Sequence, residues 1–438
     1  MQGHVRRCFS ISLWNSKMGY CRSRRVHIVL LIFLALWLYF HEDYQEKIQI
    51  LSNSPRWDNF KLSEGEDKST SDKPANILFW TPYQHEMVEW NHIFGRLLNK
   101  ECPVNNCQLM FNRSQIHEAD AVVFSNVYMN RDNDFSTPAT HPTYQFWVML
   151  SFEGHLSFRG KHEKDTDYAV RGGPDNPVWE YQVNEMSKMG INWTMHFRRD
   201  AHVRVPYGTF TWTDDGTGIE DKDYWSTKNI TKPALWMASH CHTASDRKGY
   251  VEELQKYMRV DVYGRCGKFQ CGTANLVVKQ ADWDYDHCEQ VTNEYMFYLA
   301  FENRLCADYA SEKFYRSLSQ DVIPVVLGGV EYDAFAPPNS YINALDFPSP
   351  KELASFLNKV ASDHTLYNRY FEWKKHYTIE QGHPYKSMIC NLCEKLHEVR
   401  KSPPTPKEFD LRSWIYKDGW LGTWKDAVKQ KFPHLSPK

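Results

Sequence analysis

The stretch from Phe297 to Gly329 constrains the fold of this chain most strongly, because strand and helix signals alternate within it. Phe297–Phe301 is a short apolar run typical of a buried strand, and Val322–Leu327 is a β-branched run that two glycines close. Polar residues crowd the turn and the helix start between these runs. The alternation predicts a βαβ unit with a parallel sheet. Ligands of such sheets bind beyond the carboxyl ends of the strands, so we expect the functional site there.

Similar patterns along the chain predict two successive α/β domains. The first is expected over residues 76–230, with strands at 76–80, 121–124 and 146–153 and a helix at 87–100. Its later part, residues 155–230, is rich in turn-forming residues and predicts many loops. The second is expected over residues 231–395, with strands at 234–239 and 259–264 around an amphipathic helix at 246–258. Residues 396–438 form a C-terminal extension to which the sequence assigns no role.

The N-terminus predicts a membrane anchor. An uncharged apolar stretch at residues 26–40 follows arginines 22, 24 and 25, so residues 1–25 are expected to form a cytosolic tail. The stretch is short against the ~20 residues that span an average bilayer, and a cleaved signal peptide is the alternative. The absence of a small-x-small cleavage site and the aromatic residues at the exit favour a signal anchor. The polar residues 41–75 then form a stem, because they cannot bury enough surface to fold.

The cysteines and glycosylation signals agree with a lumenal body. The chain has 11 cysteines, nine of them after the anchor, and an oxidising lumen makes disulfides the default. An odd number leaves one thiol unpaired or intermolecular. A zinc site at Cys266, Cys271 and Cys288 is the competing idea, but that spacing matches no common zinc pattern. Acceptor signals for N-glycosylation, which predict surface positions if they are used, occur at Asn112, Asn192 and Asn229.

Several functional classes lack support. The formal net charge of -2 argues against nucleic acid as a partner, since phosphate binding usually leaves a basic face. The sequence has no dinucleotide-binding glycine motif, no phosphate loop and no Gly-x-Ser-x-Gly. Asp214 and Asp215 form an acidic doublet that could hold a metal, but the surrounding TDDGTG segment is explained more simply as a solvated turn.

The polar turn of the opening stretch fits an anionic ligand. Lys313 near the start of a helix opposes the helix dipole, and a bound anion would offset that cost and use the free backbone N–H groups. A diphosphate fits this position, and Glu312 could then hold the hydroxyls of a ribose. In the alternative interpretation Glu312 and Lys313 are ordinary first-turn residues with Ser311 near the cap.

The same stretch, AFENRLCADYASEKFYRSLSQDVIPVVLGG, resembles the donor-binding signature of the α1,3-fucosyltransferases. Further blocks resemble that family in the same order, at residues 151–154, 191–208, 236–264 and 390–393, so the likeness extends from about residue 76 to 395. It implies two Rossmann-like domains facing a cleft (GT-B), preceded by a single N-terminal transmembrane anchor and a stem. It also implies inverting transfer of L-fucose from GDP-fucose to a GlcNAc hydroxyl by a single-pass type II protein of the Golgi membrane, with its catalytic domain in the lumen.

The resemblance also implies residue roles. Glu153 would be the general base that takes the proton of the acceptor hydroxyl. Lys313 and Arg247 would neutralise the diphosphate as GDP leaves, so no cofactor is obligatory and a divalent cation, Mn or Mg, is expected at most to stimulate. Glu302 would be structural or would contact the fucose ring. The remaining donor-binding residues would be Tyr263, Asn303, Tyr309 and Glu312. From the residues alone, Glu153 could equally be a capping or salt-bridging group, and Arg247 a helix-surface arginine.

Two N-terminal cysteines of that family pair with a C-terminal Cys-x-x-Cys. The resemblance therefore implies that Cys102 and Cys107 bond Cys390 and Cys393, with the pairing left open. A redox motif at Cys390 and Cys393 is the alternative, although the thioredoxin-like context for it is lacking.

The chain departs from the family pattern at a few positions. Arg304 replaces a Ser, Ser311 a Thr, Ala310 a β-branched residue and His240 an Asn, and no Pro follows Gly154. These departures bear on acceptor choice and donor affinity more than on the reaction class.

The leading hypothesis is thus an α1,3-fucosyltransferase that acts on GlcNAc of glycoprotein N-glycans. Extra cysteines between Gly264 and Cys288 resemble invertebrate and plant members that fucosylate the core, so core GlcNAc is favoured over Lewis-type antennae. The alternatives are a catalytically weak, membrane-tethered protein that binds glycans or GDP-fucose, and a related transferase that uses another nucleotide sugar. Retention of Glu153, Arg247, Glu312 and Lys313 favours the enzyme.

Overall fold

The computed structural model describes residues 73–81, 87–126, 129, 142, 144–154, 177–213, 222–271, 286–381, 385–401, 409–417, 419 and 421–435. The predicted tail, the anchor at residues 26–40, nearly all of the stem and the Asp214–Asp215 doublet lie outside these ranges. Within them, every helix is too short or too polar to cross a lipid bilayer.

A six-stranded parallel sheet forms the first half, in the order β2-β1-β3-β4-β5-β6. The strands are β1 (Ala75–Phe79), β2 (Cys107–Met110), β3 (Ala121–Ser125), β4 (Phe146–Leu150), β5 (Trp193–His196) and β6 (Val203–Arg204). The helices are α2 (Met87–Glu101), α4 (Pro177–Lys188), α10 (Tyr385–Lys401) and α11 (Leu411–Tyr416). The strands β1, β3 and β4 and the helix α2 confirm the sequence patterns, whereas β2 and α4 were not predicted.

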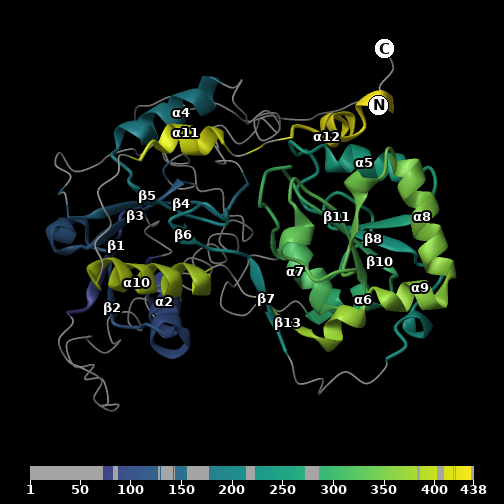
Figure 1. Cartoon of the computed structure of the whole chain (residues 1–438), viewed down its shortest axis with the longest axis horizontal. Coiled ribbons are helices and arrows are strands. Elements are labelled where there is room, and N and C mark those ends of the chain that lie inside the picture. The colour runs from purple at the N-terminus through teal and green to yellow at the C-terminus, as the bar shows by residue number, and fades with distance from the viewer. Residues whose placement is uncertain are drawn as a thin grey trace, which may run out of the picture. The chain divides into compact units, whose positions relative to one another are not determined.

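Alternate side chains of this sheet pack against two different helix pairs. Val123 points into a core with α2 and α10, and its neighbour Val122 into a core with α4 and α11. Figure 1 shows α10 beside α2 and α11 beside α4. Because the strands are buried on both faces, they are nearly continuous apolar runs, as expected of a parallel sheet.

A five-stranded parallel sheet forms the second half, in the order β12-β11-β10-β8-β9. Its strands are β8 (Ala234–Met237), β9 (Val260–Tyr263), β10 (Phe297–Phe301), β11 (Ile323–Leu327) and β12 (Ile342–Asn343). One face packs against α5 (Arg247–Leu254), α8 (Pro350–Ser362), α9 (His364–Arg369) and α12 (Trp424–Lys431). The other packs against α7 (Glu312–Ser319), and α6 (Asp286–Asn293) precedes β10. The βαβ unit predicted at Phe297–Gly329 is therefore confirmed as β10-α7-β11.

The chain passes between the halves along a two-stranded antiparallel ribbon. Strand β7 (Gly208–Trp212) follows the first sheet and pairs with β13 (Tyr377–Gln381), which precedes α10. The ribbon packs on α7, and a side chain at Gly208 would meet the Tyr315 ring at 2.5 Å. Glycine is thus required where the ribbon crosses this helix. Short 3-10 helices complete the described chain at Arg113–Glu118, Trp225–Thr227, Tyr332–Ala334, Ala344–Asp346, Glu372–Lys375 and Pro433–Leu435.

The end of the chain returns to the first half. Side chains of α10, including Met388 and Leu392, are buried in the core of the first sheet. The domain limit that we placed at residue 395 therefore does not follow the packing. After β13 of the ribbon, the chain already packs in the core of the first half. Helix α12 then packs on the second half through Trp424, whose indole N–H donates to Asp246 at 3.2 Å. The C-terminal extension therefore contributes to both cores.

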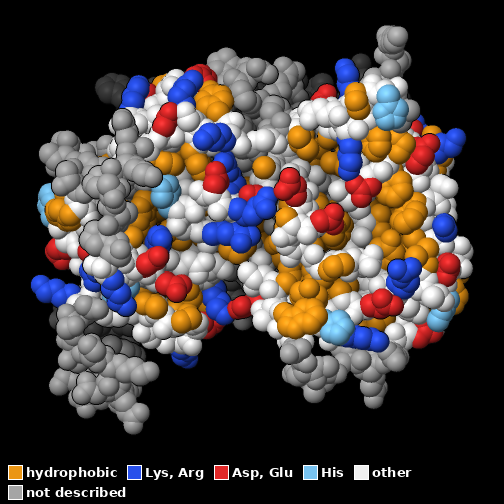
Figure 2. Space-filling model, viewed as in Figure 1, with side chains coloured by type: hydrophobic (Ala, Val, Ile, Leu, Met, Phe, Trp, Pro, Cys, Tyr) orange, Lys and Arg blue, Asp and Glu red, His pale blue; other side chains and the backbone are white. Residues whose placement is uncertain are grey.

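The surface carries both signs of charge. On the face drawn in Figure 2, lysine, arginine, aspartate and glutamate side chains lie interspersed among apolar ones. This distribution agrees with the formal net charge of -2.

Candidate active site

A cavity of about 320 Å³ lies at the carboxyl ends of β8 and β10, where ligands of parallel sheets bind. The first half contributes two lining residues, Glu153 and Tyr207, and the second half contributes the rest. Those are Met237, Ala238, Ser239, His240, Arg247, Tyr298, Asn303, Tyr309, Glu312, Lys313 and Arg316.

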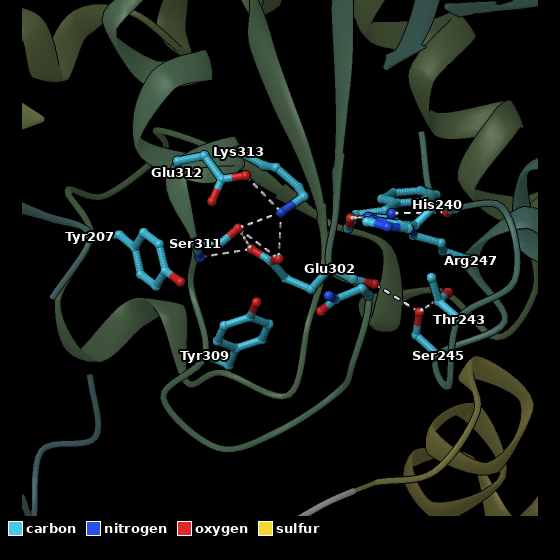
Figure 3. Close-up of polar contacts among 12 residues, drawn as sticks. Tyr207, His240, Thr243, Ser245, Arg247, Glu302, Tyr309, Ser311, Glu312 and Lys313 are labelled. Carbon is cyan, nitrogen blue, oxygen red and sulfur yellow. Dashed lines mark hydrogen bonds and ion pairs between the residues drawn. The ribbon is translucent and has the colours of Figure 1, made fainter. Parts of the chain in front are cut away.

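A polar network at the start of α7 supports the cavity floor (Figure 3). The carboxylate of Glu302 is fully buried at the end of β10 and accepts hydrogen bonds from the Ser311 amide at 2.8 Å and from the Ser311 hydroxyl. Lys313 Nζ lies 3.4 Å from Glu302 Oε2, 2.8 Å from Ser311 Oγ and 2.9 Å from Glu312 Oε1. Ser311 thus uses its hydroxyl to join the carboxylate to the ammonium group.

The electrostatics of this network keep Lys313 charged. Burial by itself lowers the pKa of the ammonium group, but the carboxylates of Glu302 and Glu312 raise it above its ordinary value. Burial raises the pKa of Glu302, and the charge of Lys313 opposes that shift. Ser311 occupies the N-cap position without a side-chain cap bond. The amides of the first turn of α7 are therefore not capped by this side chain, and they add to the attraction for an anion.

Arg247 forms the opposite side of the cavity. Its guanidinium is buried, with Nη1 donating to the Phe301 carbonyl at 2.7 Å and Nη2 to the His240 carbonyl at 3.2 Å. Nε has no hydrogen-bond partner among the described residues. Burial lowers the pKa of this guanidinium, and the charge of Glu302 opposes that shift. Because its neighbours are carbonyl oxygens, the cation is held in place while its charge remains available to a ligand.

Glu153 lines the same cavity as Lys313 and Arg247, but it comes from the first half. It follows β4 and is half-buried, and it accepts long hydrogen bonds from the Tyr309 hydroxyl at 3.4 Å and from Asn303 Nδ2 at 3.5 Å. A side chain at Gly154 would meet the Tyr309 ring at 2.6 Å, so glycine permits the close approach of the two halves. Burial and the charge of Glu153 raise the pKa of Tyr309 well above its ordinary value, which keeps this hydroxyl a hydrogen-bond donor.

A second contact joins the halves beside the cavity. Arg199, in the loop after β5, donates through Nε to Asp308 at 2.8 Å and through its backbone amide to the same carboxylate at 3.0 Å. Asp308 has a φ of 60°, in the left-handed region that most residues avoid. The ring of Phe197 packs on Tyr309 at 4.9 Å. The turn that carries Tyr309 is therefore held from the first half.

The structure brings together six of the proposed site residues and separates two. The lining includes Glu153, Arg247, Asn303, Tyr309, Glu312 and Lys313. Glu302 lies buried beneath the cavity, which fits the structural role and not contact with a sugar ring. Tyr263 does not line the cavity, because its hydroxyl turns away to meet the Tyr295 hydroxyl at 3.1 Å.

Sequence reasoning missed several lining residues. Arg316 lies three residues after Lys313, so helical spacing could have placed both on the same face of α7. Tyr298 lies in β10, four residues before Glu302, which directly follows the strand, so the two-residue period of a strand could have indicated the same side for both. Tyr207 gave no such signal.

The disulfides confirm the implied partners and resolve their pairing. Cys102 bonds Cys390, and Cys107 bonds Cys393, across 288 and 286 residues of sequence. Two further cysteines of the suggested zinc site are in disulfides, Cys266 with Cys241 and Cys271 in another bond, so neither has a free thiolate for a metal. Cys306 is a buried thiol.

The three glycosylation signals differ in their surroundings. Asn112 and Asn229 are exposed, and each accepts a hydrogen bond from the hydroxyl of its own signal. Asn192 is half-buried, with its Oδ1 accepting from the Trp147 amide at 2.8 Å and its Nδ2 donating to the Gln145 carbonyl at 3.2 Å. Because a glycan would attach to that nitrogen, Asn192 is less suited to glycosylation in the folded chain than the two exposed asparagines.

A parallel-sheet fold with cations and a helix start around a pocket at the strand ends is typical of proteins that bind phosphorylated nucleotides. Two protein-family models match the chain. The family model described as "Fucosyltransferase, N-terminal" matches residues 72–208, and the one described as "Glycosyltransferase family 10 (fucosyltransferase) C-term" matches residues 225–414. The chain belongs to glycosyltransferase family 10, the fucosyltransferases.

Two relatives from Drosophila melanogaster agree with this assignment. The chain is 31% identical over 385 residues to glycoprotein 3-alpha-L-fucosyltransferase A of Drosophila melanogaster, covering 82% of this chain and 68% of the relative. It is 29% identical over 420 residues to alpha-(1,3)-fucosyltransferase C of the same organism, covering 89% and 88%. A crystal structure of an alpha1,3-fucosyltransferase with GDP-fucose aligns with a TM-score of 0.46 at 14% identity, over 79% of this chain and 96% of that one.

Proposed function

We propose that this protein transfers L-fucose from GDP-fucose, with inversion, in α1,3 linkage to GlcNAc of glycoprotein N-glycans, with core GlcNAc as the preferred acceptor. The two sheets would act as the paired domains of a GT-B enzyme. An N-terminal signal anchor would hold it in the Golgi membrane as a single-pass type II protein, with the catalytic body in the lumen.

The observation that carries the proposal is that one carboxylate and two cationic side chains line the same cavity from different halves of the molecule. Glu153 comes from the first half, whereas Lys313 and Arg247 come from the second half. A transfer that inverts the sugar needs a base on the face opposite the leaving group, and it needs cations at the leaving group. The family assignment supplies the substrate class that this arrangement would serve.

The expected steps follow from this arrangement. The Glu153 carboxylate takes the proton of the acceptor hydroxyl while that oxygen attacks the anomeric carbon of fucose. The bond from that carbon to the phosphate oxygen breaks on the opposite face. Negative charge then grows on GDP, where Lys313, Arg247 and the first-turn amides of α7 stabilise it. Asn303, Tyr309 and Glu312 line the same cavity and would contact the donor.

We propose that no metal cofactor is obligatory, because two cationic side chains already face the expected diphosphate. Mn or Mg would at most stimulate the reaction by screening the released GDP. Turnover that survives dialysis against EDTA would support this view, and complete loss that only a metal restores would contradict it.

Transfer assays on the purified lumenal body test the proposed function. Residues 41–438 would be incubated with GDP-fucose and two acceptors, an N-glycan with an unmodified core and a LacNAc oligosaccharide. NMR of the product gives the linkage position and the anomeric configuration. We expect an α1,3-fucosylated core GlcNAc, and preference for LacNAc would reassign the acceptor to glycan antennae.

The alternatives predict different outcomes of the same assays. A protein that only binds ligands would show no turnover on any acceptor, while GDP would still raise its melting temperature. A transferase for another donor would be inactive with GDP-fucose and active with a different nucleotide sugar.

A further inference from the structure

One wall of the cavity is a short segment at the point where the chain leaves β8. Residues 237–240, here called the pocket wall, begin at the end of β8 and all line the cavity. The side chains of Ser239 and His240 are exposed, and Cys241 follows directly. Because no helix or strand fixes residues 238–240, their position depends on contacts with neighbouring segments.

The turn after β9 supports the pocket wall from one side. The Ala238 amide donates to the Tyr263 carbonyl at 2.9 Å, and the Cys266 amide donates to the Ala238 carbonyl at 3.1 Å. Gly264 has a φ of 87°, and a side chain there would lie 2.7 Å from the Ala238 oxygen. The disulfide between Cys241 and Cys266 fastens the far end of the wall to this same turn.

The pocket wall in turn supports a cation of the site. The His240 carbonyl accepts a hydrogen bond from Arg247 Nη2, and Figure 3 shows His240 beside Arg247. The other anchor of the guanidinium is the Phe301 carbonyl at the end of β10, which is part of the sheet. A shift of His240 would therefore remove one of the two described anchors of Arg247.

We propose that the Cys241–Cys266 disulfide is a positioning device for the donor site, one that holds the pocket wall and Arg247 against the diphosphate. The inference rests on the proposed function only in taking that diphosphate to be the one of GDP-fucose. The segment between the two cysteines contains α5 and β9, whose buried residues Tyr250, Leu254 and Val260 belong to the core of the second half. That core keeps these elements folded without the bond, so loss of the disulfide acts chiefly on the wall.

The test compares GDP binding and kinetics in two disulfide variants. C241S/C266S removes the wall bond, and C107S/C393S is the matched control that removes a disulfide of the first half, away from the cavity. For C241S/C266S we expect GDP affinity to fall about tenfold and the donor KM to rise by a similar factor, since the loss of one interaction with a charged group changes affinity by about this factor. The acceptor KM should stay within about twofold, because Glu153 and Tyr207 belong to the other half. The control should melt earlier and bind GDP as the wild type does.

Two outcomes overturn the inference. One is an unchanged GDP affinity and donor KM in C241S/C266S. The other is an equal loss of GDP affinity in both variants, which would indicate general destabilisation. If C241S/C266S does not fold, Gly264→Ala displaces the Ala238 carbonyl with the disulfide intact, and it should give the same donor-side loss; unchanged GDP binding there would equally overturn the inference.

Failure of the proposed function is distinguishable from these outcomes. A wild-type protein that binds GDP but transfers no fucose would contradict the proposed activity, while the affinity of the variants for GDP alone would still decide the role of the disulfide. A wild-type protein that binds no GDP would overturn both.

Discussion

The two halves of the molecule contribute to the cavity in different ways. The second half supplies eleven lining residues, and below them Glu302, Ser311 and Lys313 form a network with contacts of 2.8 to 3.4 Å. The first half supplies only Glu153 and Tyr207, and the hydrogen bonds of Glu153 are 3.4 and 3.5 Å long. The proposed donor side is thus preorganised, whereas the proposed base is held at the junction by two long hydrogen bonds.

This difference predicts that mutations can separate GDP binding from the transfer step. Changes in the second half should weaken GDP binding, since its cations and amides form the proposed anion site. Changes in the first half should spare GDP binding and affect either the transfer step or the stability of the fold. Each of the following predictions tests one side of this division.

Replacing Glu153 by Gln should nearly abolish transfer. A general base contributes typically ~10²–10⁴-fold to the rate, and the amide keeps the shape of the side chain but cannot take the proton. The affinity for GDP, measured by calorimetry, should remain within about twofold, because the cations of the second half are untouched. Glu331→Gln, at an exposed carboxylate outside the cavity, is the matched control and should keep full activity. Transfer by Glu153→Gln at a tenth of the wild-type rate or more would show that another group is the base.

Removing both long-range disulfides should destabilise the first half without changing the donor site. Cys102–Cys390 and Cys107–Cys393 each span nearly the whole folded body, and loop-closure entropy suggests a combined contribution of about 8 kcal/mol, most of it from the first long loop that is closed. With one bond intact, the other closes only a short loop, so each single loss should cost about 2–3 kcal/mol. Thermal melting of the single and double variants checks this. A double variant that loses GDP binding at a temperature where it remains folded would contradict the separation of the halves.

Lys313→Met should weaken GDP binding about 10- to 100-fold, since hydrogen bonds to charged groups contribute ~1.5–3 kcal/mol each. The acceptor KM should change little. Lys359→Met makes the same substitution on the exposed face of α8 and should leave binding unchanged. Equal GDP affinity in the Lys313 variant and the wild type would remove Lys313 from the diphosphate site.

The same variant should lose stability in a pH-dependent way. Burial raises the pKa of Glu302, and Lys313 opposes that shift in the wild type. Without the ammonium group, the folded-state pKa of Glu302 rises further above its unfolded value, so the folded variant binds more protons at acidic pH. Its stability should therefore be highest in acid and fall as the pH rises through that folded pKa. Melting curves from pH 5 to 8 should show the deficit of Lys313→Met growing with pH. A deficit that is constant over this range would mean that Glu302 does not titrate there.

The sequence predicted much of the second half and less of the first. The βαβ unit at Phe297–Gly329 combines apolar runs, a polar turn and a helix start within one local stretch, so the site at its strand end could be anticipated. Helix α4 lies in a segment rich in turn-forming residues, and its packing against the first sheet and α11 explains its stability. The return of α10 to the first sheet depends on contacts between residues nearly 290 positions apart, which local patterns cannot reveal. The orientation of Tyr263 could not be predicted, because a strand-end tyrosine can turn either to the cavity or to a neighbour such as Tyr295.

Arg199→Ala tests the junction itself and should have the mildest effect. The guanidinium pairs with Asp308, but about half of its side chain is exposed (48%), and exposed ion pairs contribute only ~0.2–1 kcal/mol. Since Asp308 directly precedes Tyr309, which contacts Glu153, a looser turn should lower kcat by no more than about fivefold while GDP affinity stays constant. A double-mutant cycle with Asp308→Asn measures the coupling in both kcat and melting temperature. Additive effects in that cycle would mean that the pair does not position the turn, and a large loss of GDP binding would mean that the junction belongs to the donor side.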